Sequence, residues 1–197
     1  KKLFLTAAVA VSSLTFAQQF GAKAGMNVST ISDEGFDDTK SKVGYYAGVF
    51  MNVPVSESFS IQPEVLYNNL GSKVSSTVSG TTYSSTLNLD YVAVPVMFQY
   101  KATPQFYLEA GPEFGFLVNA KQKFDNGSSS IVTELDKEDF NSFNMGVGLG
   151  LGFDISKNVG LNARYVAGFS DITKESGPST DAKNKNNAFQ VGLNIKF

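Results

Sequence analysis

Apolar and polar residues alternate without a break in Phe189-Gln190-Val191-Gly192-Leu193-Asn194-Ile195-Lys196-Phe197, the last nine residues of the sequence. A strand alternates in this way when one of its faces meets apolar surroundings and the other does not. The same two-residue period recurs in seven segments upstream, so the sequence predicts eight strands. We expect these strands at residues 19–28, 43–53, 59–69, 87–100, 105–120, 142–154, 158–170 and 187–197.

The connections between the expected strands alternate between short and long. Three are short, at residues 54–58, 101–104 and 155–157, and four are long and polar, at residues 29–42, 70–86, 121–141 and 171–186. Outer-membrane barrels place short turns at the periplasmic end and long loops outside, and a strand of about 9–11 residues crosses the bilayer. The sequence therefore predicts an all-β fold, an eight-stranded antiparallel up-and-down transmembrane β-barrel with long extracellular loops and short periplasmic turns.

The two faces of each expected strand differ in character. One face is apolar and has aromatic residues near the strand ends, which is typical of a lipid-facing wall with two interfacial girdles. The other face carries glycines, charges and a few bulky side chains. Because eight strands enclose only enough room for side chains, we expect the glycines to make space for the bulky inward residues Tyr46, Phe50, Tyr91, Tyr107 and Leu117.

Three prolines lie within the expected strands, at Pro63, Pro95 and Pro112. Each lacks the amide donor of a ladder hydrogen bond, and a closed barrel has no free edge to accommodate it. We expect bulges or skipped pairings at these three positions.

Residues 1–17 have the pattern of a secretory signal peptide. Lys1 and Lys2 precede a short apolar segment, and Thr15 and Ala17 supply the small residues of a cleavage site. We expect cleavage near Ala17 and a barrel domain at residues 18–197. The remainder is mildly acidic and has no basic patch, which gives nucleic-acid binding no electrostatic support.

Four stretches resemble the PorT-like outer-membrane β-barrel family of Gram-negative bacteria. They are Asp90-Tyr91-Val92-Ala93-Val94-Pro95-Val96-Met97-Phe98-Gln99-Tyr100, Tyr107-Leu108-Glu109-Ala110-Gly111-Pro112-Glu113-Phe114-Gly115, Asn144-Met145-Gly146-Val147-Gly148-Leu149-Gly150-Leu151-Gly152 and Leu161-Asn162-Ala163-Arg164-Tyr165. The resemblance implies a small eight-stranded barrel in the outer membrane of a Gram-negative bacterium. The family takes its name from a member involved in protein secretion.

The resemblance also suggests a role for the terminal strand. An aromatic C-terminal residue on an alternating strand resembles the signal that the barrel-assembly machinery reads during biogenesis. The alternative is that Phe197 is one more aromatic residue of a girdle. The signal strand would present Phe189, Val191, Leu193, Ile195 and Phe197 on its apolar face, and we expect it to close the barrel against residues 20–28.

Charged residues on the inward faces form the most informative candidate site. By strand parity, the side chains that point into the lumen are Lys23, Glu64, Glu109, Glu113 and Arg164, with Lys196 near the end of the last strand. An Arg between carboxylates forms bidentate, charge-assisted hydrogen bonds, and such pairing allows charges to be kept inside a narrow barrel. Counting from the short turns places Glu64 and Arg164 at similar heights, with Glu109 below and Glu113 above. We expect a structural salt-bridge plug in which Arg164 contacts Glu109 and Glu113 across the lumen; a gate or ion path is the alternative.

The residue types argue against catalysis and against a bound cofactor. The chain has no Cys and no His, which removes the usual thiolate nucleophile, general base and transition-metal ligand. Glu109 and Glu113 could be a hydrolytic pair, but an Arg partner would keep both ionised and leave no acid. The acidic stretch at residues 33–38 lacks the spacing of a calcium loop and is expected to be a solvated loop. We therefore expect no catalytic, cofactor or metal site.

The sequence thus indicates a non-enzymatic integral outer-membrane barrel, structural or engaged in surface recognition, with a lumen filled by side chains. Its expected partners are outer-membrane lipid, the barrel-assembly machinery and an unknown protein bound through the long loops, and the barrel itself is expected to be monomeric. Two alternatives stay open. One is an accessory component of a secretion or cell-surface assembly, and the other is a soluble lipocalin-like barrel that binds a hydrophobic ligand.

Overall fold

A computed structural model describes residues 18–32, 40–78, 81–137, 140–172 and 185–197. The expected signal peptide at residues 1–17 and the acidic stretch at residues 33–38 lie outside the described residues. Within the described part, no helix is both long and apolar enough to cross a membrane.

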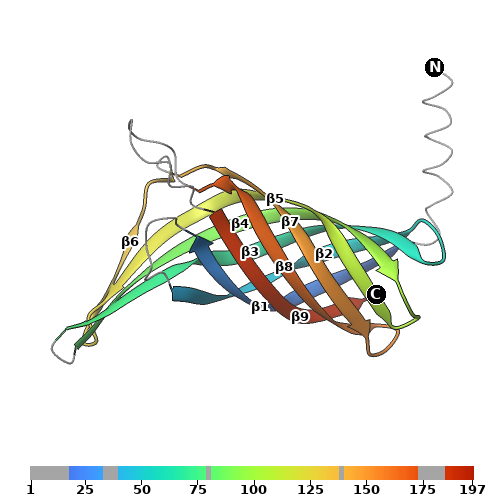
Figure 1. The fold of residues 1–197 in the computed structure, drawn as a ribbon, viewed down its shortest axis with the longest axis horizontal. Helices are drawn as coiled ribbons and strands as arrows, with labels where there is room; N and C mark the ends of the chain where they lie inside the picture. Colours follow the sequence, from blue (N-terminus) through green and yellow to red (C-terminus); the bar gives the residue numbers. More distant parts are fainter. Residues whose placement is uncertain (1–17, 33–39, 79–80, 138–139, 173–184) are drawn as a thin grey trace, which may run out of the picture.

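The described residues form nine antiparallel strands, eight of which close into a ring (Figure 1). Their bounds are β1 Gln19–Ser32, β2 Lys40–Pro54, β3 Phe59–Val78, β4 Thr81–Lys101, β5 Phe106–Asp125, β6 Ser130–Glu134, β7 Phe143–Asp154, β8 Val159–Asp171 and β9 Lys185–Lys196. Each ring strand pairs with its neighbours in sequence, except that β6 lies outside the ring and β5 pairs directly with β7. The eight-stranded up-and-down barrel predicted from the sequence is confirmed.

The seam of the barrel joins the first strand to the last. β1 and β9 pair without interruption from Gly21 opposite Lys196 to Ser32 opposite Lys185. Tight turns close the end at which β9 finishes, with the amide of Val55 bonded to the Phe59 carbonyl at 2.8 Å and that of Ile155 to the Val159 carbonyl at 2.9 Å. These short turns are periplasmic, and the long connections lie at the opposite, extracellular end.

The outer wall of the ring is apolar over its whole circumference. Leu149 is 61% exposed, Val49 57% and Leu193 49%, which for large apolar side chains indicates contact with lipid rather than water. Aromatic rings pair across neighbouring strands near both ends of this wall. The centroids of Phe59 and Tyr100 are 5.0 Å apart at the periplasmic end. Tyr45 and Tyr67 are 6.1 Å apart towards the extracellular end, as two girdles require.

The prolines interrupt the strand pairing at all three positions, as predicted. Pairing of β2 with β3 skips the stretch between Phe50–Glu64 and Val53–Ile61, and Pro63 lies in that gap. Pairing of β4 with β5 stops at Pro95 and resumes at Phe98. Pro112 lies in the same gap on the β5 side, between Glu113 and Ala110, while β5 keeps an unbroken register with β7. Proline has no amide hydrogen to donate. At Pro112 the position of this donor faces β4, where the gap in the β4–β5 pairing contains no ladder hydrogen bond.

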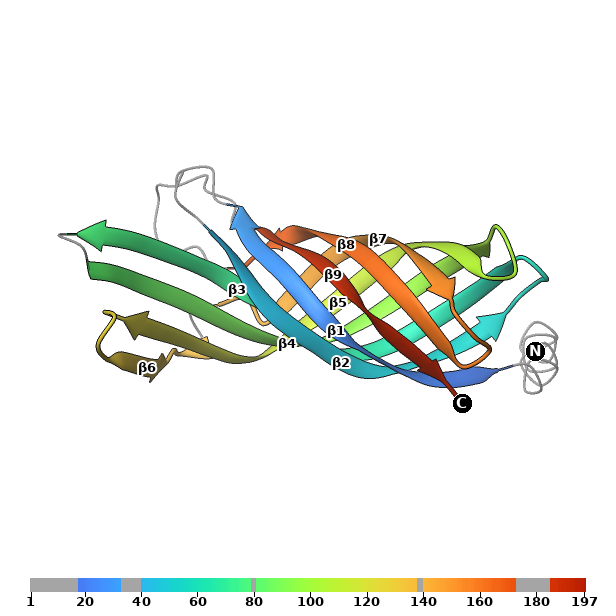
Figure 2. The same ribbon diagram turned by 90° about the horizontal axis from the view of Figure 1, so that it is seen from below.

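Two of the connections predicted to be long polar loops are largely strand. Residues 70–78 and 81–86 continue β3 and β4 in register from Leu70 opposite Leu89 to Val78 opposite Thr81. Residues 121–125 continue β5, and β6 folds back on them as an added strand. Together, residues 74–78, 81–86, 121–125 and 130–134 form a four-stranded sheet, here called the extension. It projects past the ends of the other strands (Figure 2).

Candidate functional site

Arg164 lies at the centre of the lumen and holds two carboxylates. Its Nη1 and Nη2 atoms donate to Glu64 Oε2 and Oε1 at 2.9 and 2.8 Å, the bidentate geometry of an Arg–carboxylate pair. Its Nε donates to Glu109 Oε1 at 2.8 Å. Lys23 Nζ adds an ion pair to Glu64 Oε1 at 2.8 Å. The four side chains are at most 1% exposed, and they come from β8, β3, β5 and β1.

Neutral polar side chains satisfy the remaining atoms of this cluster on its periplasmic side. Gln62 Nε2 donates to Glu64 Oε1 at 2.8 Å, and Gln99 Nε2 donates to Glu109 Oε2 at 3.0 Å. Asn52 connects the two amides, because its Nδ2 lies 3.1 Å from the Gln62 oxygen and 2.8 Å from the Gln99 oxygen. A buried charge is stable only when it is paired and fully bonded, and this network meets that requirement for both carboxylates.

A second chain of hydrogen bonds crosses the lumen beside the ion cluster. The Tyr46 hydroxyl donates to Asn162, Asn162 donates to Asn194, and Asn194 donates to the Tyr107 hydroxyl, at 2.8, 2.9 and 3.0 Å. All four side chains are buried. These bonds connect opposite walls of the barrel and occupy the space that a diffusion path would need.

Two of the predicted inward charges lie apart from Arg164. Glu113 is buried, but its carboxylate forms no ion pair among the described residues, so the expected Arg164–Glu113 contact was wrong. The reason is register: Glu64 of the opposite wall takes the bidentate face of Arg164, and Glu113 lies four residues beyond Glu109 on β5, towards the extracellular end. Lys196 pairs with Asp154 at 2.6 Å at the periplasmic rim.

Small residues make room for the bulky inward side chains, as the sequence predicts. A side chain at Gly25 or Gly192 would collide with the ring or hydroxyl of Tyr46, and one at Gly152 would overlap the ring of Tyr107. Tyr46, Phe50, Tyr91, Tyr107 and Leu117 are all buried. Large and small side chains therefore interlock across the lumen at close packing.

An apolar cluster fills the extracellular part of the lumen, above the ions. It contains barrel residues together with Phe140 and Ile172 from the connections. The amide of Asn141 donates to the Ile172 carbonyl at 2.8 Å, which ties these two connections to each other. The buried members of the cluster are Leu70, Leu89, Tyr91, Leu117, Ala120, Phe140, Ile172 and Ala188.

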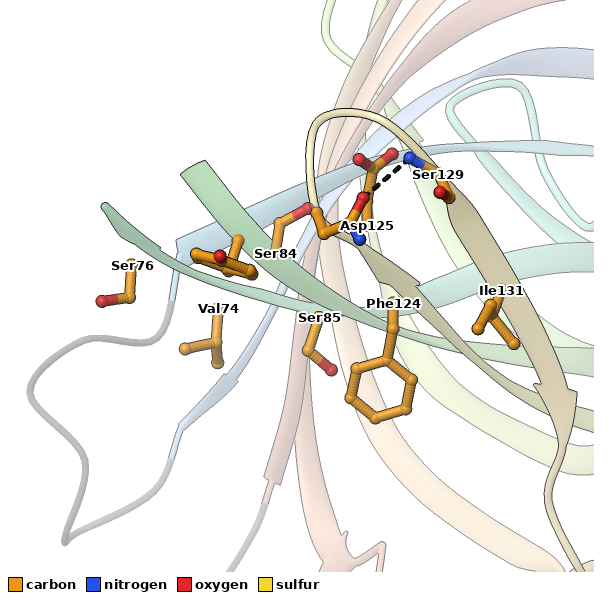
Figure 3. A pocket seen from close by; sticks show the side chains of 10 residues that line it. Val74, Ser76, Ser84, Ser85, Phe124, Asp125, Ser129 and Ile131 are labelled. Atoms are coloured by element: carbon orange, nitrogen blue, oxygen red, sulfur yellow. Dashed lines mark hydrogen bonds between the residues drawn. The ribbon is translucent and has the colours of Figure 1, made fainter. Parts of the chain in front are cut away.

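The extension carries a partly open apolar hollow of about 380 Å³ on the face that continues the inner wall (Figure 3). Register places Val74 opposite Ser85, Ser85 opposite Phe124 and Phe124 opposite Ile131, so these side chains form one row across four strands. Tyr83 extends the row at the tip. Phe124 is 48% and Ile131 66% exposed although both lie outside the lipid-facing wall. An exposed apolar surface of this kind in water marks an interaction site.

A well-formed turn fixes the geometry of the extension at its β5–β6 end. Asn126 Oδ1 accepts from the amides of Ser128 and Ser129 at 3.1 and 2.7 Å, and the second of these bonds is drawn in Figure 3. Gly127 has φ of 82°, a left-handed conformation that favours glycine. The hollow therefore rests on regular sheet rather than on an irregular loop.

The described residues contain no group of three or more Asp, Glu, His or Cys side chains that could hold a metal ion. Sequence reasoning missed the amide network of Asn52, Gln62 and Gln99, although these residues share the inward parity of Glu64 and Glu109. It also missed the extension, in which the apolar residues Val74, Tyr83 and Phe124 each stand between polar residues.

The comparisons with known proteins agree with this geometry. The family described as the outer membrane protein beta-barrel domain matches residues 16–174. The chain belongs to this outer-membrane β-barrel family. It is therefore an integral barrel of the Gram-negative outer membrane. This family is broader than the PorT-like family, so membership of the PorT-like family stays a prediction.

Solved barrels of the outer membrane share the fold at low sequence identity. Ail, the attachment invasion locus protein of Yersinia pestis, is 14% identical with a TM-score of 0.53, over 91% of this chain and 98% of that one. Neisserial surface protein A is 14% identical with a TM-score of 0.52, over 90% of this chain and 97% of that one. No curated relative matches the sequence. At this identity the likeness concerns the fold alone.

Proposed function

We propose that this outer-membrane β-barrel is a non-enzymatic surface-recognition protein whose lumen is closed and whose extension binds a partner outside the cell. The observation that carries the proposal is the exposed apolar row of Val74, Tyr83, Phe124 and Ile131 on a regular sheet above the membrane. Apolar side chains in lipid need no partner, but at this height they face water. A stable extension that exposes them is therefore suited to binding.

The lumen supports the non-enzymatic part of the proposal. The Arg164–Glu64–Glu109 cluster is fully paired and lies beneath a packed apolar cluster, so no substrate can reach the carboxylates. We favour the structural plug over the gate, because each bond of Arg164 would have to break to open a path.

An accessory role in a secretion or cell-surface assembly is the second candidate, and it is the role implied by the resemblance to PorT-like proteins. The hollow favours this role equally, since a protein partner in an assembly would bind the same surface. The soluble lipocalin-like alternative is set aside, because the wall exposes Leu149, Val49 and Leu193 to lipid and the lumen is filled. We propose that the barrel is monomeric. Recognition of β9 by the barrel-assembly machinery stays a prediction.

Site-specific photo-cross-linking in the native membrane tests the proposal. A photo-reactive amino acid at Phe124 or Tyr83 is expected to give a discrete adduct with a macromolecule from the cell surface or medium. The same group at Lys157, in an exposed periplasmic turn, is the matched control and should not give that adduct. Adducts with lipid alone, or an identical pattern at all three positions, would contradict recognition through the extension.

A further inference from the structure

A small enclosed chamber lies in the lumen between the ion cluster and the apolar cluster. Its volume is about 20 Å³, which is enough for one particle the size of a water molecule. Asn68 from β3, Glu113 from β5 and Asn186 from β9 line it from three sides of the barrel. Gly115, Gly146 and Gly168 create its space, and the rest of the wall is formed by Leu70, Tyr91, Ala93, Asn144, Val166 and Ala188.

Several of the polar atoms that line the chamber lack partners. Glu113 Oε2, both amide atoms of Asn68 and both amide atoms of Asn186 are buried without a hydrogen bond among the described residues. Asn68 is 0%, Asn186 4% and Glu113 8% exposed. Buried polar groups are almost always bonded, and a group left without a bond costs about 1–3 kcal/mol. Several such atoms directed at one space indicate a bound species.

The charges show what kind of species would be favoured. The inward cluster contains two cations, Lys23 and Arg164, and three carboxylates, Glu64, Glu109 and Glu113. A further buried cation, Lys42, is bonded elsewhere, to the Asn69 side chain and the Leu70 carbonyl. Arg164 uses Nε, Nη1 and Nη2 on Glu64 and Glu109, and Lys23 is bonded to Glu64. Glu113 is thus the carboxylate without a compensating bond. An uncompensated buried charge is strongly destabilising.

We propose that the chamber of Glu113, Asn68 and Asn186 binds a small monovalent cation such as Na⁺. The donor set consists of one carboxylate and neutral amide oxygens, which are the hard oxygen ligands that alkali cations accept. A single negative charge balances a monovalent ion, whereas a divalent ion would leave an excess of positive charge. The apolar cluster above and the ion pairs below enclose the ion, so it is a structural element that enters when the barrel closes.

Two substitutions distinguish the effect of the Glu113 charge from the effect of the free volume in the chamber. Glu113→Gln removes the charge and keeps the shape of the side chain. Gly115→Ala keeps the charge but places a methyl group in the chamber, where its closest neighbour would be Tyr91 Cδ1 at 3.4 Å, an ordinary contact. Glu134→Gln on the exposed strand β6, whose side chain is 80% exposed, is the matched control for loss of a carboxylate.

The experiment refolds each protein from denaturant in detergent, once in sodium chloride and once in N-methyl-D-glucamine chloride at equal ionic strength. The organic cation is too large for the chamber. The Tm of the wild type and of Glu134→Gln is expected to fall by about 3 °C or more in the organic salt. The Tm of Glu113→Gln and Gly115→Ala should be the same in both salts. A wild-type Tm that does not depend on the cation would overturn the proposal, whether or not the variants fold.

Infrared spectroscopy distinguishes the ion from a proton on the carboxyl group. The spectrum of the wild type in sodium chloride minus that of Glu113→Gln should lack the carbonyl band of a protonated acid. A band of this kind would show that Glu113 is neutral and that the chamber holds only water, and this result would also overturn the proposal. Either outcome leaves recognition through the extension untouched.

Discussion

At the residue scale, Arg164 is the side chain on which the lumen depends most, because it neutralises two carboxylates that come from two other strands of the ring. Glu64 belongs to β3 and Glu109 to β5, and both reach Arg164 on β8. Inward parity alone predicted that these residues face the lumen. Counting residues from the short turns also placed Glu64 at the height of Arg164, but neither parity nor counting fixes the rotamers that leave Glu113 out of contact with Arg164. The partnering of Glu64 rather than Glu113 follows from the stagger of the closed ring.

Removing Arg164 should therefore destabilise the barrel far more than removing Lys23. Arg164→Ala leaves Glu64 and Glu109 buried beside a cavity, and we expect a loss of about 3–5 kcal/mol in the free energy of unfolding. Lys23→Ala should cost less, because Glu64 retains the bidentate Arg164 and the Gln62 amide. Urea unfolding in lipid vesicles, followed by circular dichroism, measures both, with Lys157→Ala in a periplasmic turn as a control. Equal losses for Arg164→Ala and Lys157→Ala would show that the cluster contributes no stability.

The interlocking of small and large side chains gives a second prediction at this scale. A methyl group at position 152 would overlap only side-chain atoms of Tyr107 among its nearest neighbours. We expect Gly152→Ala to destabilise the barrel by about 1–3 kcal/mol through overpacking. In the double variant Gly152→Ala, Tyr107→Leu, the second change should relieve part of that loss. A double-mutant cycle with no coupling would argue against this contact.

At the scale of elements, the ring strands could be predicted because their alternation is strong, with large apolar residues on one face. The up-and-down order of these strands could be predicted because short and long connections alternate along the chain. The extension was missed because its outward positions are mostly Ser, Thr and charged residues, and its inward apolar positions are widely spaced. The β-branched and aromatic residues Val74, Tyr83, Ile131 and Val132, with the Asn126-Gly127 turn, were the available signal. Such a polar sheet is stable here because it continues a ladder that the barrel has already formed.

The extension should consequently depend on the barrel, while the barrel should not depend on the extension. Register allows a clean deletion, since Lys73 faces Thr86 and Lys121 faces Glu134. Replacing residues 74–85 and 122–133 each by an Asn-Gly turn should leave the Tm within about 4 °C of the wild type. Thermal unfolding and heat-modifiable gel migration measure this. A variant that no longer folds would show that the extension is part of the folding unit rather than an added surface.

At the scale of the whole molecule, three layers fill the barrel from the periplasmic to the extracellular end. The paired ion cluster comes first, the chamber of Glu113 lies above it, and the apolar cluster closes the top. The outer wall meets lipid and the extension meets water, so the same chain presents apolar side chains to two different solvents. The central claim is that nothing crosses this lumen and that the external surface carries the function.

Planar-bilayer recording of the purified, refolded barrel tests this claim most directly. The wild type should insert without producing steady conductance steps, and the deletion variant that lacks the extension should be equally silent, because the ion cluster and the apolar cluster remain. Steady single-channel steps from the wild type that change on Arg164→Ala would contradict the closed lumen and would identify the cluster as a gate.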